Sequence, residues 1–309
     1  MQQQPVSHAF RRHGLGICLA VVPGVMHSFR PILLILALAM AIPAAAQTPT
    51  PDPAVAPAPA PEEADPDARI DALQPDFDLG ALPTTLRMPV HKLAMRITHR
   101  FARPLGQGDF GDLASDAFGF DGGAQIGLEV RYGLARGTQV GIHRTSNRDI
   151  QVFGQRTLFR QQQGMPVTLD AMATIEGHNN LRERHRSALG LVGSHTVGRL
   201  AALYAEPFFV VNSNPAASQG FDNNTVMLGL GGRLRIRPTT YIMAELTPRI
   251  AGFDPGVTQI SFGLEARAGG HLFQLNVSNG LGTTLGQIAD GAFNHDNWFL
   301  GFNIARKFF

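Results

Sequence analysis

The segment between residues 225 and 247 constrains the fold more than any other part of this sequence. Apolar residues or glycines occupy every second position from Val226 to Ile236, the pattern stops at residues 237–240, and it resumes over residues 241–247. Such strict alternation is typical of a β-strand with one apolar face and one wet face. The short break between the two runs predicts a β-hairpin.

The same alternation recurs to the end of the chain. Tight connections on one side alternate with longer ones on the other, as in outer-membrane barrels, which have short periplasmic turns, longer outer loops and an even number of strands. A soluble barrel or sandwich would not need this parity. We therefore predict an all-β fold, an antiparallel transmembrane β-barrel of about twelve strands with both termini periplasmic. The predicted strands cover residues 92–101, 124–132, 138–145, 149–161, 167–176, 187–197, 200–211, 226–236, 241–247, 257–268, 271–278 and 297–309, with a bulge near Gly154 in the fourth.

The N-terminal region predicts an export route. The sequence is 44% hydrophobic and 16% charged, and residues 26–46 combine a short basic region, an apolar core too short to span a bilayer, and small residues before a cleavage site. We interpret them as a signal peptide and residues 1–25 as an over-extended start, although Arg11-Arg12 offers a weaker twin-arginine alternative. The single cysteine, Cys18, lies in this removed part, so no disulfide or thiol chemistry is expected. The predicted destination is the bacterial outer membrane.

Residues 47–79 differ in composition from everything that follows. They are rich in proline, alanine and acidic residues, which cannot bury a core, so we expect a disordered linker there and the barrel at residues 80–309. Residues 1–79 hold 8 of the 24 acids and 4 of the 26 Lys and Arg residues, which leaves residues 80–309 with a net charge of +6.

Several stretches together resemble a β-barrel family catalogued as domain of unknown function 5777. The resemblance covers about residues 85–309 and implies a barrel in the outer membrane with no established activity. The terminal aromatic, Phe309, is also similar to the closing strand by which barrel-assembly machinery recognises its substrates, although Lys307 departs from that pattern. The matching stretches are Ile97-Thr-His-Arg-Phe101, Phe118-Gly-Phe-Asp121, Ile126-Gly-Leu-Glu-Val-Arg-Tyr-Gly133, Val140-Gly-Ile-His-Arg-Thr145, Gln161 to Pro166, Ala244-Glu245 with Pro248, and Gly301-Phe-Asn-Ile-Ala-Arg-Lys307.

One motif suggests an enzyme. The run Asn276-Val-Ser-Asn-Gly280 resembles the His-x-Ser-Asn-Gly motif of outer-membrane phospholipase A, in which a histidine base must reach the serine hydroxyl. Here Asn276 replaces that base, and His271 is an odd number of positions from Ser278, hence on the other strand face. We expect no enzyme, and lipid hydrolysis through Ser278 is a third alternative.

The other chemistry-bearing residues give weaker signals. No two histidines have the i, i+2 strand spacing that would aim both at one metal ion. Four residues of the last outer loop could meet Ca²⁺, but polar loop composition explains them more simply: Asp290, Asn294, Asp296 and Asn297. We expect no cofactor, no metal and no nucleic acid.

The polar face of the strands then defines the lumen. Charges on the lipid side would cost about 2–4 kcal/mol each near the midplane, so the charged side chains are expected to point inward. They could line a mixed-charge pore with mild anion preference, or pair into a plug that closes the barrel. We predict a passive small-solute channel, with a closed structural or partner-binding barrel as the alternative; the other expected partners are outer-membrane lipid and the barrel-assembly machinery. The lumen-facing candidates are Glu129, Arg131, Arg233, Arg235, Glu245, Glu265 and Arg267.

Overall fold

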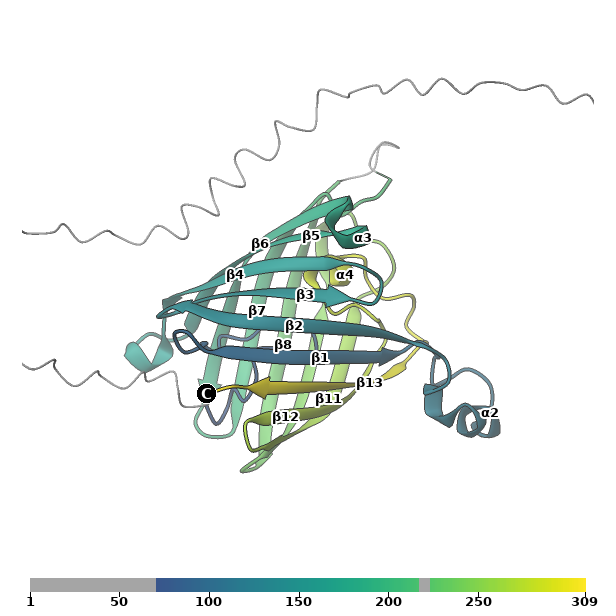
Figure 1. The fold of residues 1–309 in the computed structure, drawn as a ribbon, viewed down its shortest axis with the longest axis horizontal. Coiled ribbons are helices and arrows are strands. Elements are labelled where there is room, and N and C mark those ends of the chain that lie inside the picture. Colours follow the sequence, from purple (N-terminus) through teal and green to yellow (C-terminus); the bar gives the residue numbers. More distant parts are fainter. Residues whose placement is uncertain (1–70, 217–222) are drawn as a thin grey trace, which may run out of the picture. The chain divides into compact units, whose positions relative to one another are not determined.

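The computed structural model describes residues 71–216 and 223–309, and their strands form one antiparallel sheet that closes on itself (Figure 1). Apart from the short β10, consecutive strands pair with each other, β9 pairs with β11, and β13 pairs with β1. The short β10 pairs with β8 alone and continues β9 beyond Pro248, so twelve strands make the closed wall. The predicted twelve-stranded antiparallel barrel is confirmed.

The strand boundaries follow the sequence alternation closely. The strands are β1 (Leu93–Phe101), β2 (Ala124–Ala135), β3 (Thr138–Thr145), β4 (Ile150–Phe159), β5 (Thr168–Gly177), β6 (Glu183–Val197), β7 (Ala201–Val211), β8 (Thr225–Arg237), β9 (Thr240–Thr247), β10 (Arg249–Gly252), β11 (Gln259–Ala268), β12 (His271–Ser278) and β13 (Phe299–Lys307). The helical turns are α2 (Phe110–Ser115), η3 (Ala117–Gly119), η4 (Gln161–Gln163), α3 (His178–Leu181) and α4 (Leu285–Ala289).

Alternation along each strand separates an apolar outer face from an inner one. In β9, Tyr241, Met243 and Glu245 are buried inside, whereas Ile242 and Leu246 are exposed on the outside. Closure pairs every strand edge, which is the condition for a sheet to lie in hydrocarbon. Among the described residues, no helix has both the length and the apolar character needed to cross a membrane.

The two ends of the barrel differ in their connections. One end, here called the short-turn end, carries the tight links at residues 136–137, 198–200, 238–239 and 269–270. The other, the long-loop end, carries residues 102–123 and 279–298, and α2 projects from it (Figure 1). The first and last barrel strands begin and end at the short-turn end, where Ala94 pairs with Lys307.

The irregularity expected in β4 lies three residues later than predicted. Gly154 pairs in regular register with Ala173, and the register of β4 against β5 shifts between Thr157 and Phe159. The bulge therefore falls next to the connection to β5, where fewer ladder bonds are disrupted.

The segment before β1 departs from the sequence prediction. Residues 71–90, which we call the plug segment, are not a linker: Leu79 and Leu82 are 0% exposed, and residues 80–92 are not part of the barrel wall. A tight turn closes with Leu79 N donating to Leu82 O at 2.8 Å and Thr84 N donating to Phe77 O at 2.7 Å. The predicted start region (1–25), the signal peptide (26–46) and residues 47–70 of the predicted linker lie outside the described residues.

The last long loop also folds inward, through α4. All five residues of α4 are buried, and Leu285, Ile288 and Ala289 belong to a single apolar cluster with wall residues such as Phe208. Ala81 of the plug segment belongs to the same cluster. The interior is thus occupied from both ends by the chain itself.

Candidate functional site in the barrel lumen

The plug segment is fixed to the wall chiefly at Glu245 of β9. Its carboxylate accepts backbone hydrogen bonds from Gly80 at 2.9 Å, Ala81 at 2.8 Å and Leu82 at 3.1 Å, and a fourth from the Ser261 hydroxyl at 2.6 Å. Successive N–H groups that converge on one point form a concave anion site. Glu245 is 3% exposed, so the negative charge is held inside the barrel by the backbone of the plug segment itself.

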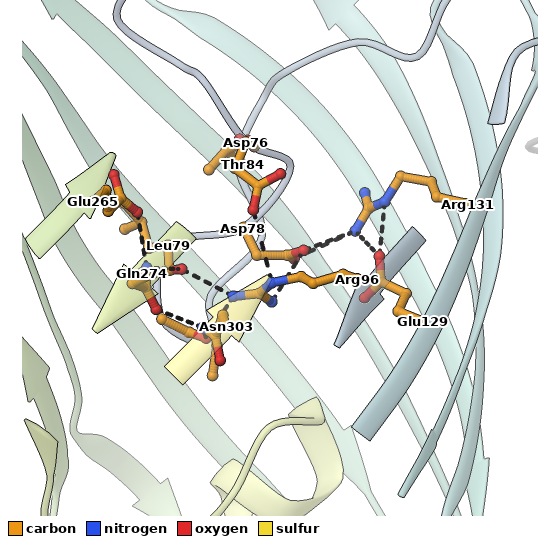
Figure 2. Close-up of polar contacts among 12 residues, drawn as sticks. Asp76, Asp78, Leu79, Thr84, Arg96, Glu129, Arg131, Glu265, Gln274 and Asn303 are labelled. Atoms are coloured by element: carbon orange, nitrogen blue, oxygen red, sulfur yellow. Dashed lines mark hydrogen bonds and ion pairs between the residues drawn. The ribbon is translucent and has the colours of Figure 1, made fainter. Parts of the chain in front are cut away.

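The carbonyl groups of the same turn face β1, β12 and β13. Gly80 O accepts from Arg96 Nη2 at 2.8 Å and from Asn303 at 3.2 Å. Leu79 O accepts from Arg96 Nη2 at 3.0 Å and from Gln274 at 3.0 Å (Figure 2). Donors and acceptors of the turn are therefore satisfied by β1, β9, β12 and β13, as buried backbone groups require.

Two aspartates of the plug segment reach a cluster of wall cations. Asp78 lies 3.2 Å from Arg96 Nη1 and 3.3 Å from Arg131 Nη2, and these pairs appear together in Figure 2. Lys307 Nζ lies 2.9 Å from Asp76. All five side chains are buried, so each charge depends on its partner for compensation.

The structure places the seven predicted lumen residues in two groups. Glu129, Arg131, Arg233, Glu245 and Glu265 have buried inward side chains. Arg131 Nε donates to Glu129 at 3.0 Å, and Arg233 Nε lies 2.5 Å from Glu265.

The remaining two, Arg235 and Arg267, are only partly buried. They lie near the short-turn end of β8 and β11, where Arg235 donates to Pro238 O at 3.0 Å. They border the lumen entrance and take no part in the plug contacts described above.

Sequence reasoning missed several plug contacts. Arg96 and Arg100 have the inward phase of β1, a signal that the alternation already contained. Asn303 and Gln274 also share the inward phase of β13 and β12, but as uncharged side chains they were not singled out as lumen candidates. Asp76 was missed because it lies in a segment whose composition predicts disorder.

The lumen also contains a carboxylate that the plug segment does not pair. Glu206 of β7 is 0% exposed, and neither carboxylate oxygen has a hydrogen-bond partner among the described residues. Gly229 lies beside both Glu206 and Leu82 of the plug segment. A Cβ at Gly229 would lie 2.8 Å from Leu82 Cδ2 and 3.2 Å from Glu206 Cβ, so glycine allows Leu82 to pack here. The plug segment thus covers a wall that is itself polar.

Polar contacts hold α4 in place at the long-loop end. Arg186 Nη1 donates to Gly286 O at 2.8 Å, and Arg186 Nη2 donates to Glu176 at 2.7 Å. The same Glu176 accepts from Gly286 N at 3.0 Å. A cavity of about 550 Å³ opens outside α4, and Asp149, Arg186 and Gln287 are among the residues that line it.

The enzymatic and metal alternatives gain no geometric support in the part of the chain that the structure describes. Ser278 Oγ accepts a hydrogen bond from Gly280 N at 3.2 Å, and His271 lies at the other end of β12. Asp290 pairs with Arg186. The side-chain oxygen of Asn294 accepts hydrogen bonds from the backbone N–H groups of Asp296 and Asn297. Among the described residues no three His, Cys, Asp or Glu side chains gather in a way that could hold a metal ion.

Comparison with known proteins agrees with this architecture. The family model described as "Membrane bound beta barrel domain (DUF5777)" matches residues 77–308, which confirms the resemblance seen in the sequence. No curated protein matches the chain.

Two kinds of solved porin structure are similar to the chain. A NanC porin structure is 10% identical with a TM-score of 0.47, over 69% of this chain and 97% of that one. A mutant of the Rhodopseudomonas blastica porin is 12% identical with a TM-score of 0.31, over 63% of this chain and 58% of that one.

Proposed function

Because the chain belongs to the DUF5777 family of membrane-bound β-barrel domains, we propose that it is a gated conduit for small polar solutes in the outer membrane. In the conformation described, the plug segment closes it, while α4 packs against the wall near the long-loop end. This differs from the passive channel that the sequence favoured, because the lumen is filled by the chain's own residues. Family membership supports a membrane location and a barrel fold. The gating is our own inference.

The observation that carries this proposal is the set of hydrogen bonds between Glu245 and residues 80–82 of the plug segment, which we call the plug turn. Three backbone N–H groups on one buried carboxylate form a contact that closes without any side chain of the plug segment. Such a contact can be remade whenever the turn returns to the lumen. Small barrels that are permanently closed are filled by the side chains of their own wall strands and need no separate segment in the lumen.

The wall behind the plug segment suits a polar solute. Its inward side chains include arginine and glutamate in comparable numbers, and a wall of this kind solvates polar and ionic groups once water enters. The principal inward charges are Arg96, Arg100, Arg131, Arg233, Glu129, Glu206, Glu245 and Glu265.

The expected orientation follows from the connections. Short turns face the periplasm in outer-membrane barrels, so the plug segment would enter from the periplasmic side, and the residues before it would lie in that compartment. A periplasmic event that pulls on residues preceding Asp71 would then open the barrel.

Liposome swelling tests the proposal. The mature chain without residues 71–88 should admit small sugars and amino acids, whereas the full mature chain should not. A chain lacking only residues 47–70 is the matched control, because it keeps the plug segment, and it should remain closed. Rapid swelling with the full chain would contradict the gate, as would a folded but impermeable barrel after removal of the plug segment.

A second candidate, a closed partner-binding barrel, is favoured by the long-loop end. Phe110 in α2 is 75% exposed, Phe293 is 68% exposed, and Phe120 also faces outward. Large exposed aromatic residues in loops are common at interaction surfaces. An impermeable truncated barrel would favour this candidate over the conduit.

A further inference from the structure

The cavity of about 550 Å³ at the long-loop end is lined mainly by planar polar side chains. It lies where α3, α4 and the turn between β3 and β4 meet, and none of the described residues of the plug segment lines it. We propose that this cavity binds a neutral carbohydrate through hydrogen bonds to the sugar hydroxyl groups. The site does not depend on the proposed gate, because it is present while the plug turn is bound to Glu245.

Five lining side chains form a continuous row of hydrogen bonds, which we call the amide row. Asn147 Nδ2 donates to Gln125 Oε1 at 2.9 Å, and Gln125 Nε2 donates to Gln287 Oε1 at 2.8 Å. Gln287 Nε2 donates to Asp149 at 2.8 Å, and His178 Nδ1 lies 2.7 Å from the same carboxylate. The three central side chains, Gln125, Gln287 and Asp149, are each 8% exposed or less. The row is therefore held in position before any ligand binds.

The amide row keeps hydrogen-bonding atoms that no described residue uses. They are the second amide hydrogen of Gln125, the side-chain oxygen of Asn147 and Nε2 of His178. These atoms combine donors with acceptors, and a hydroxyl group likewise donates one hydrogen bond and accepts others. Neighbouring hydroxyls of one sugar can therefore be bound by a single row of amide and imidazole groups.

The charges of the lining favour a neutral ligand. Arg186 lies 2.7 Å from both Glu176 and Asp290, and Arg184 lies 3.6 Å from Asp290. Asp149 is held by the amide row itself. A charged ligand would have to displace one of these contacts and leave a partner without compensation. A neutral polar ligand can instead bind the unused atoms of the amide row.

An exposed aromatic ring completes the lining. Phe293 lines the cavity and is 68% exposed, and its ring packs edge-on against the buried Phe299, with 6.2 Å between the ring centroids. The adjoining backbone is fixed because Val257 N donates to Ala292 O at 3.0 Å and Ala292 N donates to Val257 O at 2.9 Å. A sugar ring has an apolar face of C–H groups, which can leave water by lying on an aromatic ring. Amides, compensated charges and an exposed ring together fit a carbohydrate.

The test measures sugar binding to the full mature chain, refolded in a zwitterionic detergent, by saturation-transfer difference NMR. The neutral probes are glucose, galactose, maltose and lactose, and the charged probes are glucuronate and glucosamine. We expect at least one neutral sugar to bind, and neither charged sugar to bind more tightly than the neutral ones.

Two double variants locate the binding. Asn147→Ala with Phe293→Ala should weaken it about tenfold or more, because a hydrogen bond and an apolar contact are removed together. Both side chains are exposed, so the barrel should fold. Gln107→Ala with Phe110→Ala is the matched control: it removes an exposed amide and an exposed ring from the other long loop, and binding should not change.

Three outcomes would overturn the proposal. The first is that none of the neutral sugars binds to the folded chain. The second is tighter binding of glucuronate or glucosamine, which would indicate a site for a charged ligand. The third is an equal effect of the two double variants, whether a loss or no change, which would place binding outside this cavity. Because the assay measures binding to the closed chain, its outcome is separate from that of the swelling experiment.

Discussion

Arg233 and Glu265 lie on neighbouring parts of the wall with side chains that are both 0% exposed. The guanidinium makes two contacts to the carboxylate, at 2.5 and 2.9 Å, and a third to Asp78 O of the plug segment at 3.0 Å. Such a pair contributes little relative to apolar residues of the same volume, but breaking it leaves one buried charge without compensation. Because removing one partner costs much more than replacing both, substitutions at this pair report whether its charges are buried in the lumen.

Replacing Arg233 by Met should therefore destabilise the barrel by about 3–5 kcal/mol. The double variant Arg233→Met with Glu265→Gln should recover most of that loss, because no unpaired charge remains. Arg235→Met is the control at the partly exposed rim and should change stability by about 0.5 kcal/mol or less. Urea unfolding of the barrel in lipid vesicles measures all three, and equal effects at the two arginines would contradict the assigned burial.

At the scale of single elements, α4 depends on a glycine for its close approach to the wall. A Cβ at Gly286 would lie against the carboxylate of Glu176, the group that also accepts from Gly286 N. Gly286→Ala should destabilise the docked loop by about 1–3 kcal/mol through overpacking. Gly154→Ala in β4 is the control, since no atom lies within 4 Å of the added methyl group. Hydrogen exchange of the α4 amides should rise in the first variant alone, and unchanged exchange there would argue against the docking.

The strands were predictable from the sequence because of one physical constraint. Lipid outside and polar groups inside impose a period of two on every wall strand, and the period alone placed the predicted strands on their observed positions. The inward phase also assigned Arg131, Arg233 and Glu245 to the inner face of their strands, and in the structure these three side chains are buried.

The plug segment and α4 were not predictable in the same way. Residues 71–79 carry no period, and the turn that follows them, residues 80–82, is held by backbone groups that meet Glu245 from 163 to 165 positions away in the chain. The α4 region was predicted only as part of a polar loop. Leu285 and Ile288 were its apolar signal, but five residues are too few for a helical pattern to stand out.

At the scale of the whole molecule, the described conformation is a membrane barrel closed by its own chain. The plug segment contacts the wall around its circumference, and one contact offers a lock: Thr85 Oγ1 lies 2.5 Å from Ser194 Oγ of β6. Cysteines at these two positions would be close enough for a disulfide. The only natural cysteine, Cys18, precedes the predicted mature chain, so it would not interfere.

Opening should require release of the plug turn from Glu245. Glu245→Ala removes the acceptor of three buried N–H groups, and each unsatisfied donor costs about 1–3 kcal/mol. The variant barrel should therefore open in a planar bilayer while the unaltered chain stays closed.

The most direct test combines the lock with this release. Single-channel conductance is measured for the Glu245→Ala variant that also carries Thr85→Cys and Ser194→Cys, first oxidised and then reduced. The Glu245→Ala variant without these cysteines is the control, and its conductance should not change when reductant is added. We expect silence in the oxidised state and ion-conducting openings after reduction. Identical traces in the two states, whether silent or conducting, would contradict a barrel gated by its own N-terminal segment.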